Sequence, residues 1–209
     1  MDKHYLFDFD GVLVDSMEIW AGTHSAALEE AGIPIPDNFV ETITPLGNYL
    51  GSQYTISLGL KVSLEDYLAR VSQALQEAYA TRVCIKPHVA QALTRLKEQG
   101  IHLHVFTASP HSYVDDCLKR WQVYHLFEQV WTIEDFGLTK GDPEIYRQAA
   151  ARLGVDVSRC TMLDDNITVI STAKEAGLHT IAVYDKSSRG AEPAMRLTAE
   201  RYIYDFSAL

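Results

Sequence analysis

From about residue 86 onward, the chain alternates short apolar runs with amphipathic stretches of helical length, and this alternation restricts the fold more than any other feature. The apolar runs have the length and composition of buried strands. They cover residues 102–106, 130–132, 160–163 and 180–183, with a short last run near 202–203. Strands separated by helices of this length predict an α/β fold with a parallel, doubly wound, Rossmann-like sheet.

The first part of the chain has a different pattern. Residues 5–7 read as one more strand of the same sheet, whereas residues 16–82 show helical spacing and no convincing strand. Ser63, with Asp66 at the capping-box distance, predicts the start of a long helix. We therefore predict a core of residues 1–15 and 83–209 and an inserted α-helical cap over residues 16–82. Within the cap, residues 45–51 contain the glycines of a loop.

Composition restricts the partners. The 209 residues carry a formal net charge of -10, which argues against nonspecific binding to nucleic acid or anionic membranes, because such binding needs a basic face. There is no apolar stretch of membrane-spanning length and no signal-peptide pattern. Cys84, Cys117 and Cys160 lack metal-site spacing and predict buried, reduced thiols. We expect a cytoplasmic protein.

Two aspartates, Asp8 and Asp10, follow the first predicted strand directly. Two acids this close repel each other, so folding alone gives little reason to place them there. A divalent cation or a phosphoryl group would supply the reason, since one carboxylate can then be a nucleophile and the other a proton donor. A solvated turn is the alternative, because Asp and Gly favour turns.

Other polar groups follow later strands. Thr107 and Ser109 follow the strand over 102–106, and Asp164 and Asp165 follow the strand over 160–163. Because ligands bind beyond the carboxyl ends of parallel strands, these groups are expected to meet at one edge. Thr107, the helix opened after Ser109, and Lys140 could hold a phosphate. The acids could bind Mg²⁺.

Each of these groups also has a structural interpretation. Thr107 could be an ordinary strand-end hydroxyl, and Lys140 a solvated surface lysine. Asp164 and Asp165 could cap a helix, where the helix dipole favours negative charge. Taken singly, these interpretations are the more common ones, but four such motifs at one sheet edge make coincidence improbable.

The order of these motifs resembles that of the haloacid dehalogenase superfamily of phosphotransferases. Residues 7–16 read FDFDGVLVDS, residues 106–109 read FTAS, residues 140–146 read KGDPEIY, and residues 163–166 read LDDN before Ala176-Gly177. The insertion between the first two motifs is similar to the helical cap of the phosphoglycolate phosphatase-like and β-phosphoglucomutase-like subgroup.

The resemblance implies a role for each residue. Asp8 attacks phosphorus and becomes an aspartyl phosphate, and Asp10 protonates the leaving alcohol and then activates water. Thr107, Ala108 and Lys140 bind the phosphoryl group. Mg²⁺ is held by Asp8, the Asp10 backbone carbonyl and Asp165, with Asp164 near or among the ligands.

The motifs depart from the family's pattern in three places. Gly141 replaces a usual proline, Asn166 replaces a common Ser or Thr, and Val169 stands where many relatives have a further acid. Only the last change affects the surroundings of the metal, and Asp164 could compensate for it.

The expected function is that of a Mg²⁺-dependent phosphatase acting on a small phosphorylated metabolite. The alternatives are a sugar-phosphate mutase of the β-phosphoglucomutase type and a catalytically silent binding protein on the same fold. His102 and His104 are expected to be structural, because no third metal ligand is evident. Trp20 and His24 could face the substrate or pack in the cap. The oligomeric state stays open.

Overall fold

The computed structural model describes residues 3–209, except for the side chain of Pro45. The chain divides into two compact units, which are described separately. The core unit comprises Met1–Asp15 and Cys84–Leu209, and the cap unit comprises Ser16–Val83. Val83 thus falls in the cap unit, one residue beyond the boundary expected from the sequence. That these units act as catalytic core and cap stays a prediction.

The core unit contains a six-stranded sheet whose neighbouring strands all pair in parallel. The strand order is β5-β4-β1-β6-β7-β8. The bounds are β1 Lys3–Phe7, β4 Ile101–Thr107, β5 Gln129–Thr132, β6 Cys160–Asp164, β7 His179–Val183 and β8 Arg201–Ile203. The predicted doubly wound parallel sheet is therefore confirmed.

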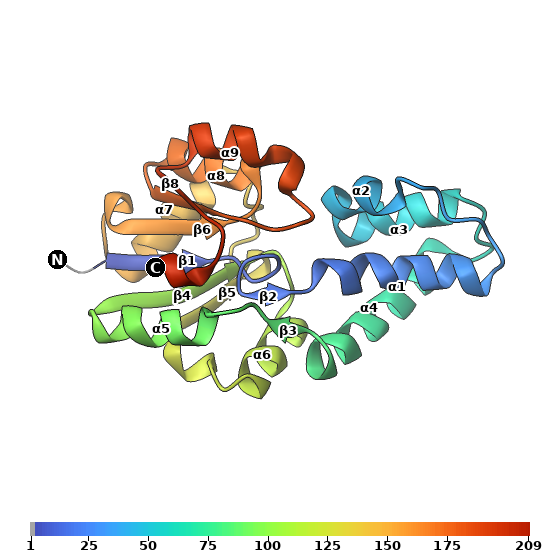
Figure 1. Ribbon diagram of the computed structural model, residues 1–209, viewed down its shortest axis with the longest axis horizontal. Helices are drawn as coiled ribbons and strands as arrows, with labels where there is room; N and C mark the ends of the chain where they lie inside the picture. Colours follow the sequence, from blue (N-terminus) through green and yellow to red (C-terminus); the bar gives the residue numbers. More distant parts are fainter. Residues whose placement is uncertain (1–2) are drawn as a thin grey trace. The chain divides into compact units, whose positions relative to one another are not determined.

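Helices cover both faces of this sheet (Figure 1), α5 and α6 on one face and α7, α8 and α9 on the other. Their bounds are α5 Val89–Glu98, α6 His111–Arg120, α7 Pro143–Leu153, α8 Ile167–Ala176 and α9 Glu192–Thr198. With helices on both sides, the central strand β1 is largely shielded from water, and its residues Leu6 and Phe7 are fully buried. The chain builds β4 and β5 on one side of β1 and β6 to β8 on the other, so the strand order reverses at β1.

A second, two-stranded sheet was not expected from the sequence. Here β2 Val14–Asp15 pairs antiparallel with β3 Cys84–Ile85, where the chain leaves and re-enters the core unit. Two residues on each strand are too few to give an alternating pattern. Cys84 is exposed, so the expectation of a buried thiol is wrong there. Cys117 and Cys160 are buried, and burial raises the pKa of each thiol to about 11.

The cap unit is helical, as expected. It contains α1 Met17–Glu30, α2 Phe39–Ile43, α3 Gly47–Ser57 and α4 Leu64–Thr81. The predicted cap of α4 is confirmed, because the Ser63 hydroxyl accepts the Asp66 N–H at 3.1 Å.

The loop expected over residues 45–51 is wrong, because this segment runs through a 3-10 turn into α3. At Gly51 a Cβ would lie 3.0 Å from the Trp20 ring and 3.2 Å from Ile43. This glycine therefore allows α3 to pack closely against its neighbours, and it does not mark a loop.

No helix within residues 3–209 combines the length and the apolar character that a bilayer crossing requires.

Candidate active site

The site begins where β1 ends. Phe7 pairs with Val105 of β4 on one side and with Leu163 of β6 on the other. Asp8 comes next and is buried, and its N–H donates to the Leu163 carbonyl at 2.9 Å. The Phe9 N–H donates to Asp8 Oδ1 at 2.7 Å, which fixes the carboxylate. The register therefore brings the ends of β4 and β6 to this carboxylate, at the point where the strand order reverses.

Asp10 and Gly11 form a tight turn immediately after Asp8. Gly11 has φ +71°, and a Cβ there would lie 2.7 Å from Asp165 Oδ2. Glycine is thus required twice, for the left-handed backbone and for the close approach of the Asp165 carboxylate. The Asp10 carboxylate accepts a hydrogen bond from the Ser109 hydroxyl at 2.5 Å, and so the first and second motifs are joined directly.

The end of β6 provides two further acids. Asp164 is fully buried, and its Oδ1 accepts the Asn166 N–H at 2.9 Å. The helix α8 is capped by Asn166, whose side chain accepts the Thr168 N–H at 2.8 Å. The capping role considered for Asp164 and Asp165 thus belongs to Asn166.

Asp8, Asp164 and Asp165 each offer a carboxylate oxygen, and these oxygens lie within 4.8 Å of one another. Burial, followed by the charges of Asp164 and Asp8, raises the pKa of Asp165 well above its usual range. Burial also raises the pKa of Asp164, with Asp8 adding to the effect and Lys140 opposing it. Three hard oxygen donors with so strong a mutual repulsion fit a divalent cation such as Mg²⁺.

Lys140 lies among these acids and is only 8% exposed, so a solvated surface lysine is excluded. Its Nζ donates to Asp164 Oδ2 at 2.7 Å and to Asp8 Oδ2 at 2.8 Å. Burial lowers the pKa of this ammonium, but the charges of Asp164 and Asp8 outweigh burial and raise it above its ordinary value. The Tyr146 hydroxyl donates to the Lys140 carbonyl at 2.7 Å and holds the residue in place.

Thr107 ends β4 and is buried, and its Oγ1 accepts the Ser109 N–H at 3.1 Å. That bond orients the turn before α6, the helix expected to offer free N–H groups to a phosphate. Ala108 is exposed in the same turn. Their binding of a phosphoryl group stays a prediction.

Two residues near the site were missed at the sequence level. The Lys86 Nζ donates to the Gly11 carbonyl at 2.5 Å and forms a partly buried ion pair with Asp185 at 2.7 Å. Asp185 follows β7 closely, so the strand-end argument applied to β1, β4 and β6 could have found it. Lys86 follows no strand of the large sheet, and its role has no signal in a single sequence.

Three residues that were considered as packing residues are confirmed as such: Trp20, His24 and His104. His24 is fully buried in the cap unit, and its Nδ1 lies 3.1 Å from the Tyr67 hydroxyl and 3.2 Å from Thr55 Oγ1. The Trp20 ring packs against it, with ring centroids 4.9 Å apart. In the core unit His104 is fully buried with Nε2 3.0 Å from His4 Nδ1. These contacts are those of packing residues.

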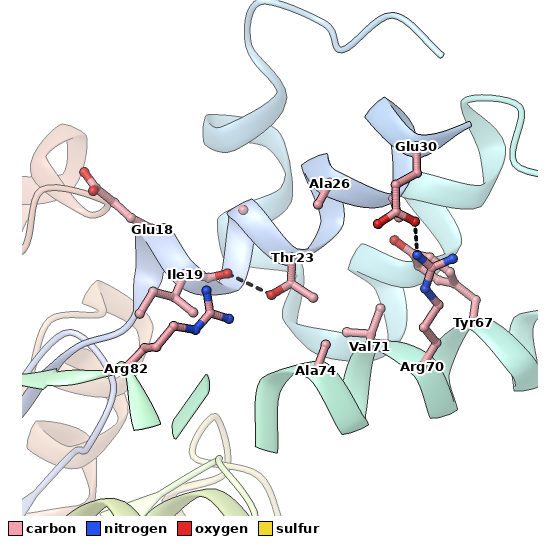
Figure 2. A pocket seen from close by; sticks show the side chains of 12 residues that line it. Glu18, Ile19, Thr23, Ala26, Glu30, Tyr67, Arg70, Val71, Ala74 and Arg82 are labelled. Atoms are coloured by element: carbon pink, nitrogen blue, oxygen red, sulfur yellow. Dashed lines mark hydrogen bonds and ion pairs between the residues drawn. The ribbon is translucent and has the colours of Figure 1, made fainter. Parts of the chain in front are cut away.

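The cap unit also has a groove of about 410 Å³ between α1 and α4 (Figure 2). The side chains of Ile19, Val71 and Ala74 line it, and the Arg70–Glu30 ion pair lies at one end. The Thr23 hydroxyl in its wall donates to the Ile19 carbonyl at 2.9 Å. Since these polar groups bond within the cap unit, they point to no particular ligand.

The sequence is similar to those of known phosphatases, in agreement with the site described above. The haloacid dehalogenase-like hydrolase family matches residues 5–183. Hexitol phosphatase B of Escherichia coli K12 is 25% identical over 186 residues, covering 85% of this chain and 82% of the relative. A phosphoglycolate phosphatase of Aliivibrio fischeri is 25% identical over 195 residues, covering 87% and 83%.

Solved structures show the same fold. A Thermotoga maritima structure, provisionally described as a β-phosphoglucomutase, superposes with a TM-score of 0.77 at 24% identity. The match covers 96% of this chain and 93% of that one.

The chain therefore belongs to the haloacid dehalogenase-like hydrolase family. The prediction of a phosphoric monoester hydrolase of this superfamily is confirmed at the level of class.

Proposed function

We propose that this protein is a Mg²⁺-dependent phosphatase that hydrolyses a small phosphate monoester through an aspartyl phosphate on Asp8. One observation carries the proposal: the buried ammonium of Lys140 contacts the expected nucleophile Asp8 at 2.8 Å, beside a group of three carboxylates. A nucleophile beside a cation that offsets phosphoryl charge is what phosphoryl transfer requires.

The reaction would run in two steps. A carboxylate oxygen of Asp8 forms a bond to phosphorus while the bond to the alcohol oxygen breaks, and Asp10 gives its proton to that oxygen. Asp10 then takes a proton from water, whose oxygen attacks phosphorus and releases phosphate and the free Asp8 carboxylate. The Ser109 hydroxyl on Asp10 orients the carboxyl group for both transfers.

The metal and the lysine would share the electrostatic work. Asp8, the Asp10 carbonyl and Asp165 would hold Mg²⁺, with Asp164 near or among the ligands, and the metal would offset the charge of the transferring phosphoryl group. Lys140 would bind the same phosphoryl group through its ammonium, and Thr107 and Ala108 would also contact that group. While no substrate is bound, Lys140 is instead neutralised by Asp8 and Asp164.

Small phosphorylated metabolites are the proposed substrates, since relatives are named as a hexitol phosphatase and a phosphoglycolate phosphatase. A mutase working through a bisphosphate needs cations on the cap to hold the second phosphate. Residues 16–82 carry three formal cations, Lys61, Arg70 and Arg82, against eight acids. Arg70 is paired with Glu30. This balance favours hydrolysis over the mutase alternative.

The test is release of phosphate from a panel of hexitol phosphates, phosphoglycolate and β-glucose 1-phosphate, with Mg²⁺ and with chelator. We expect Mg²⁺-dependent hydrolysis of at least one monoester and no stimulation by a hexose bisphosphate. Glucose 6-phosphate that accumulates faster than free phosphate would establish the mutase instead. No turnover of any ester, with ligand binding retained, would support a silent binding protein.

A cytoplasmic location is also part of the proposal. It is supported by the three cysteines, Cys84, Cys117 and Cys160, which are all free thiols, because disulfides are rare in cytosolic proteins.

A further inference from the structure

Lys86 lies outside the four motifs and has an unusually complete set of partners. Its Nζ bonds the Gly11 carbonyl at 2.5 Å, the Tyr184 carbonyl at 3.0 Å and Asp185 Oδ2 at 2.7 Å. An ammonium has three donors, and here each finds an acceptor. The side chain is 15% exposed, so this is not a surface contact that solvent would weaken.

Asp185 is itself held firmly. Its Oδ1 accepts the Ser187 N–H at 2.9 Å and the Ser187 hydroxyl at 2.6 Å, while Oδ2 faces Lys86. The residue is 5% exposed. A buried carboxylate with these bonds is a fixed point, so the ammonium attached to it is fixed as well.

The far end of this connection is the turn of the first motif. Lys86 binds Gly11 through its side chain, and its backbone N–H donates to the Leu13 carbonyl at 2.9 Å. The Gly11 N–H donates to the Val14 carbonyl at 3.0 Å. Because a peptide unit is planar, fixing this N–H also fixes the direction of the Asp10 carbonyl. That carbonyl is the proposed metal ligand, and Gly11 lies against the Asp165 carboxylate.

We propose that Lys86 is a positioning residue for the metal site: anchored on Asp185, it holds the Asp10–Gly11 turn against Asp165. The inference rests on the proposed Mg²⁺-dependent function. Lys86 touches neither the nucleophile nor the proposed metal ligands' oxygens, and acts through the backbone of Gly11.

Lys86 could affect Mg²⁺ binding through its charge or by positioning the Asp10–Gly11 turn, and these two roles predict opposite results when the ammonium is removed. If the ammonium mattered only as a positive charge near the cluster, its loss would relieve repulsion and strengthen Mg²⁺ binding. If it positions the turn, its loss would loosen the Asp10 carbonyl and weaken binding. Side chains that orient metal ligands are typically worth about 10- to 100-fold in metal affinity. We expect positioning to dominate.

The decisive variant is Lys86→Met, which keeps the length and the apolar stem but removes the ammonium. Isothermal calorimetry with MgCl₂ on the full chain should show the Mg²⁺ Kd raised by about tenfold or more. The Mg²⁺ concentration for half-maximal phosphate release should rise with it. Lys86→Arg, which keeps a donor for Gly11, should recover part of the affinity. Asp185→Asn should weaken Mg²⁺ binding less than Lys86→Met, since the ammonium still reaches Gly11.

Lys97→Met is the matched control. Lys97 Nζ also bonds two backbone carbonyls, of His125 at 3.3 Å and Leu126 at 3.1 Å, but on the exposed surface of the core unit. This variant should leave the Mg²⁺ Kd unchanged, which separates positioning from a general loss of stability. If Lys86→Met fails to fold, Lys86→Arg and Asp185→Asn carry the test.

An unchanged or lower Mg²⁺ Kd in folded Lys86→Met would overturn the inference, as would equal effects of Lys86→Met and Lys97→Met. Failure of the proposed function looks different, because the wild-type protein itself would then show no Mg²⁺-dependent release of phosphate.

Discussion

The sheet edge of the core unit and the interior of the cap unit both bury polar side chains, but of different kinds. At the sheet edge these are charges: Asp8, Asp164 and Lys140, with Asp165 alongside. In the cap they are neutral groups: the ring of His24 in α1 lies within hydrogen-bonding distance of Thr55 in α3 and of Tyr67 in α4. Burial lowers the pKa of His24 to about 4, so its ring is uncharged near neutral pH.

The difference shows which buried polar groups folding explains. The cap network ties three helices together by neutral hydrogen bonds, each worth about 1 kcal/mol. The core cluster brings three carboxylates together with one ammonium, which contacts Asp8 and Asp164, and the repulsion among the carboxylates weakens the fold. A bound cation removes that cost, so the cluster is better explained by chemistry than by stability.

The largest expected effect tests the charged side of this comparison. Asp8→Asn should leave the fold intact and abolish turnover, because an amide cannot form the phosphoenzyme. Asp10→Asn should lower kcat by about 10²-fold or more, as is usual when a general acid and base is removed. Phosphate release under saturating Mg²⁺, with circular dichroism to monitor folding, measures both.

A cap variant supplies the contrast. Thr55 Oγ1 donates to the Gly51 carbonyl at 2.8 Å, and Thr55→Val removes this bond. It should lower the free energy of unfolding by about 1 kcal/mol and leave kcat unchanged. Near wild-type activity in Asp8→Asn would show that the charged cluster is not needed for turnover, and loss of kcat in Thr55→Val would show that the neutral network of the cap is.

The next effect distinguishes the two acids at the end of β6. Asp165→Ala should raise the Mg²⁺ concentration for half-maximal activity far more than Asp164→Ala does. Asp165 lies against the Gly11 turn, whereas Asp164 is occupied by Lys140 and the Asn166 N–H. Asp164→Ala should instead cost stability, since it leaves Lys140 with fewer partners.

Titration with Mg²⁺ and urea unfolding of the two variants separate these roles. Equal shifts in the Mg²⁺ requirement would mean that both carboxylates bind the metal. A larger shift in Asp164→Ala would mean that their roles are reversed.

A smaller effect concerns a buried neutral side chain in the core unit, His104. Burial, aided by the like charge of His4, lowers the pKa of His104 to about 4, as burial does for His24. An unfolded histidine titrates near 6.5, so between about pH 4 and 6.5 the unfolded chain binds more protons. Stability therefore falls as the pH drops through this range, by about 2–3 kcal/mol for each ring.

Replacing either ring by phenylalanine removes its share of this loss. His24→Phe and His104→Phe should each flatten the fall in unfolding free energy between about pH 6.5 and pH 4.5, measured in urea. His125, which is exposed, is the control, and His125→Phe should retain the wild-type slope. If His104→Phe keeps that slope too, the ring is not held neutral and the likeness between cap and core fails.

The comparison also explains what could be predicted from the sequence. The strands of the large sheet follow from apolar runs, and the adjacency of the strand ends that carry Asp8, Thr107 and Asp164 follows from one rule about parallel strands. The apolar runs are a local feature of the sequence, and the rule about strand ends depends only on the topology of the sheet. The expected fold and the expected grouping of acids needed no knowledge of side-chain contacts.

What was missed depends on contacts between distant segments. Lys86 and Asp185 are 99 positions apart, and the sequence around each residue does not indicate that the two form an ion pair. Gly51 was read as part of a loop because a glycine in a sequence signals either flexibility or close packing. Only the neighbouring Trp20 ring decides between them. Burial likewise separates Lys140 from an ordinary surface lysine.

The smallest expected effect tests the packing side of the comparison within the cap alone. Gly51 in α3 and Gly22 in α1 are both helical glycines, and neither has a positive φ. A Cβ at Gly51 would lie 3.0 Å from the Trp20 ring, whereas a Cβ at Gly22 would meet nothing within 4 Å. Alanine is favoured over glycine in a helix by about 1 kcal/mol. At Gly22 this gain should appear in full, so Gly22→Ala should raise the free energy of unfolding by about 0.5–1 kcal/mol.

At Gly51 the same gain is opposed by overpacking, which typically costs about 1–3 kcal/mol in a tight core. Trp20 is a large, rigid ring that also packs against His24, so it has little room to move. Gly51→Ala should therefore be destabilising, opposite in sign to Gly22→Ala, and urea unfolding at neutral pH measures both. Stabilisation by both alanines would show that α3 can shift away from Trp20, and that the cap is held by its polar network rather than by this close contact.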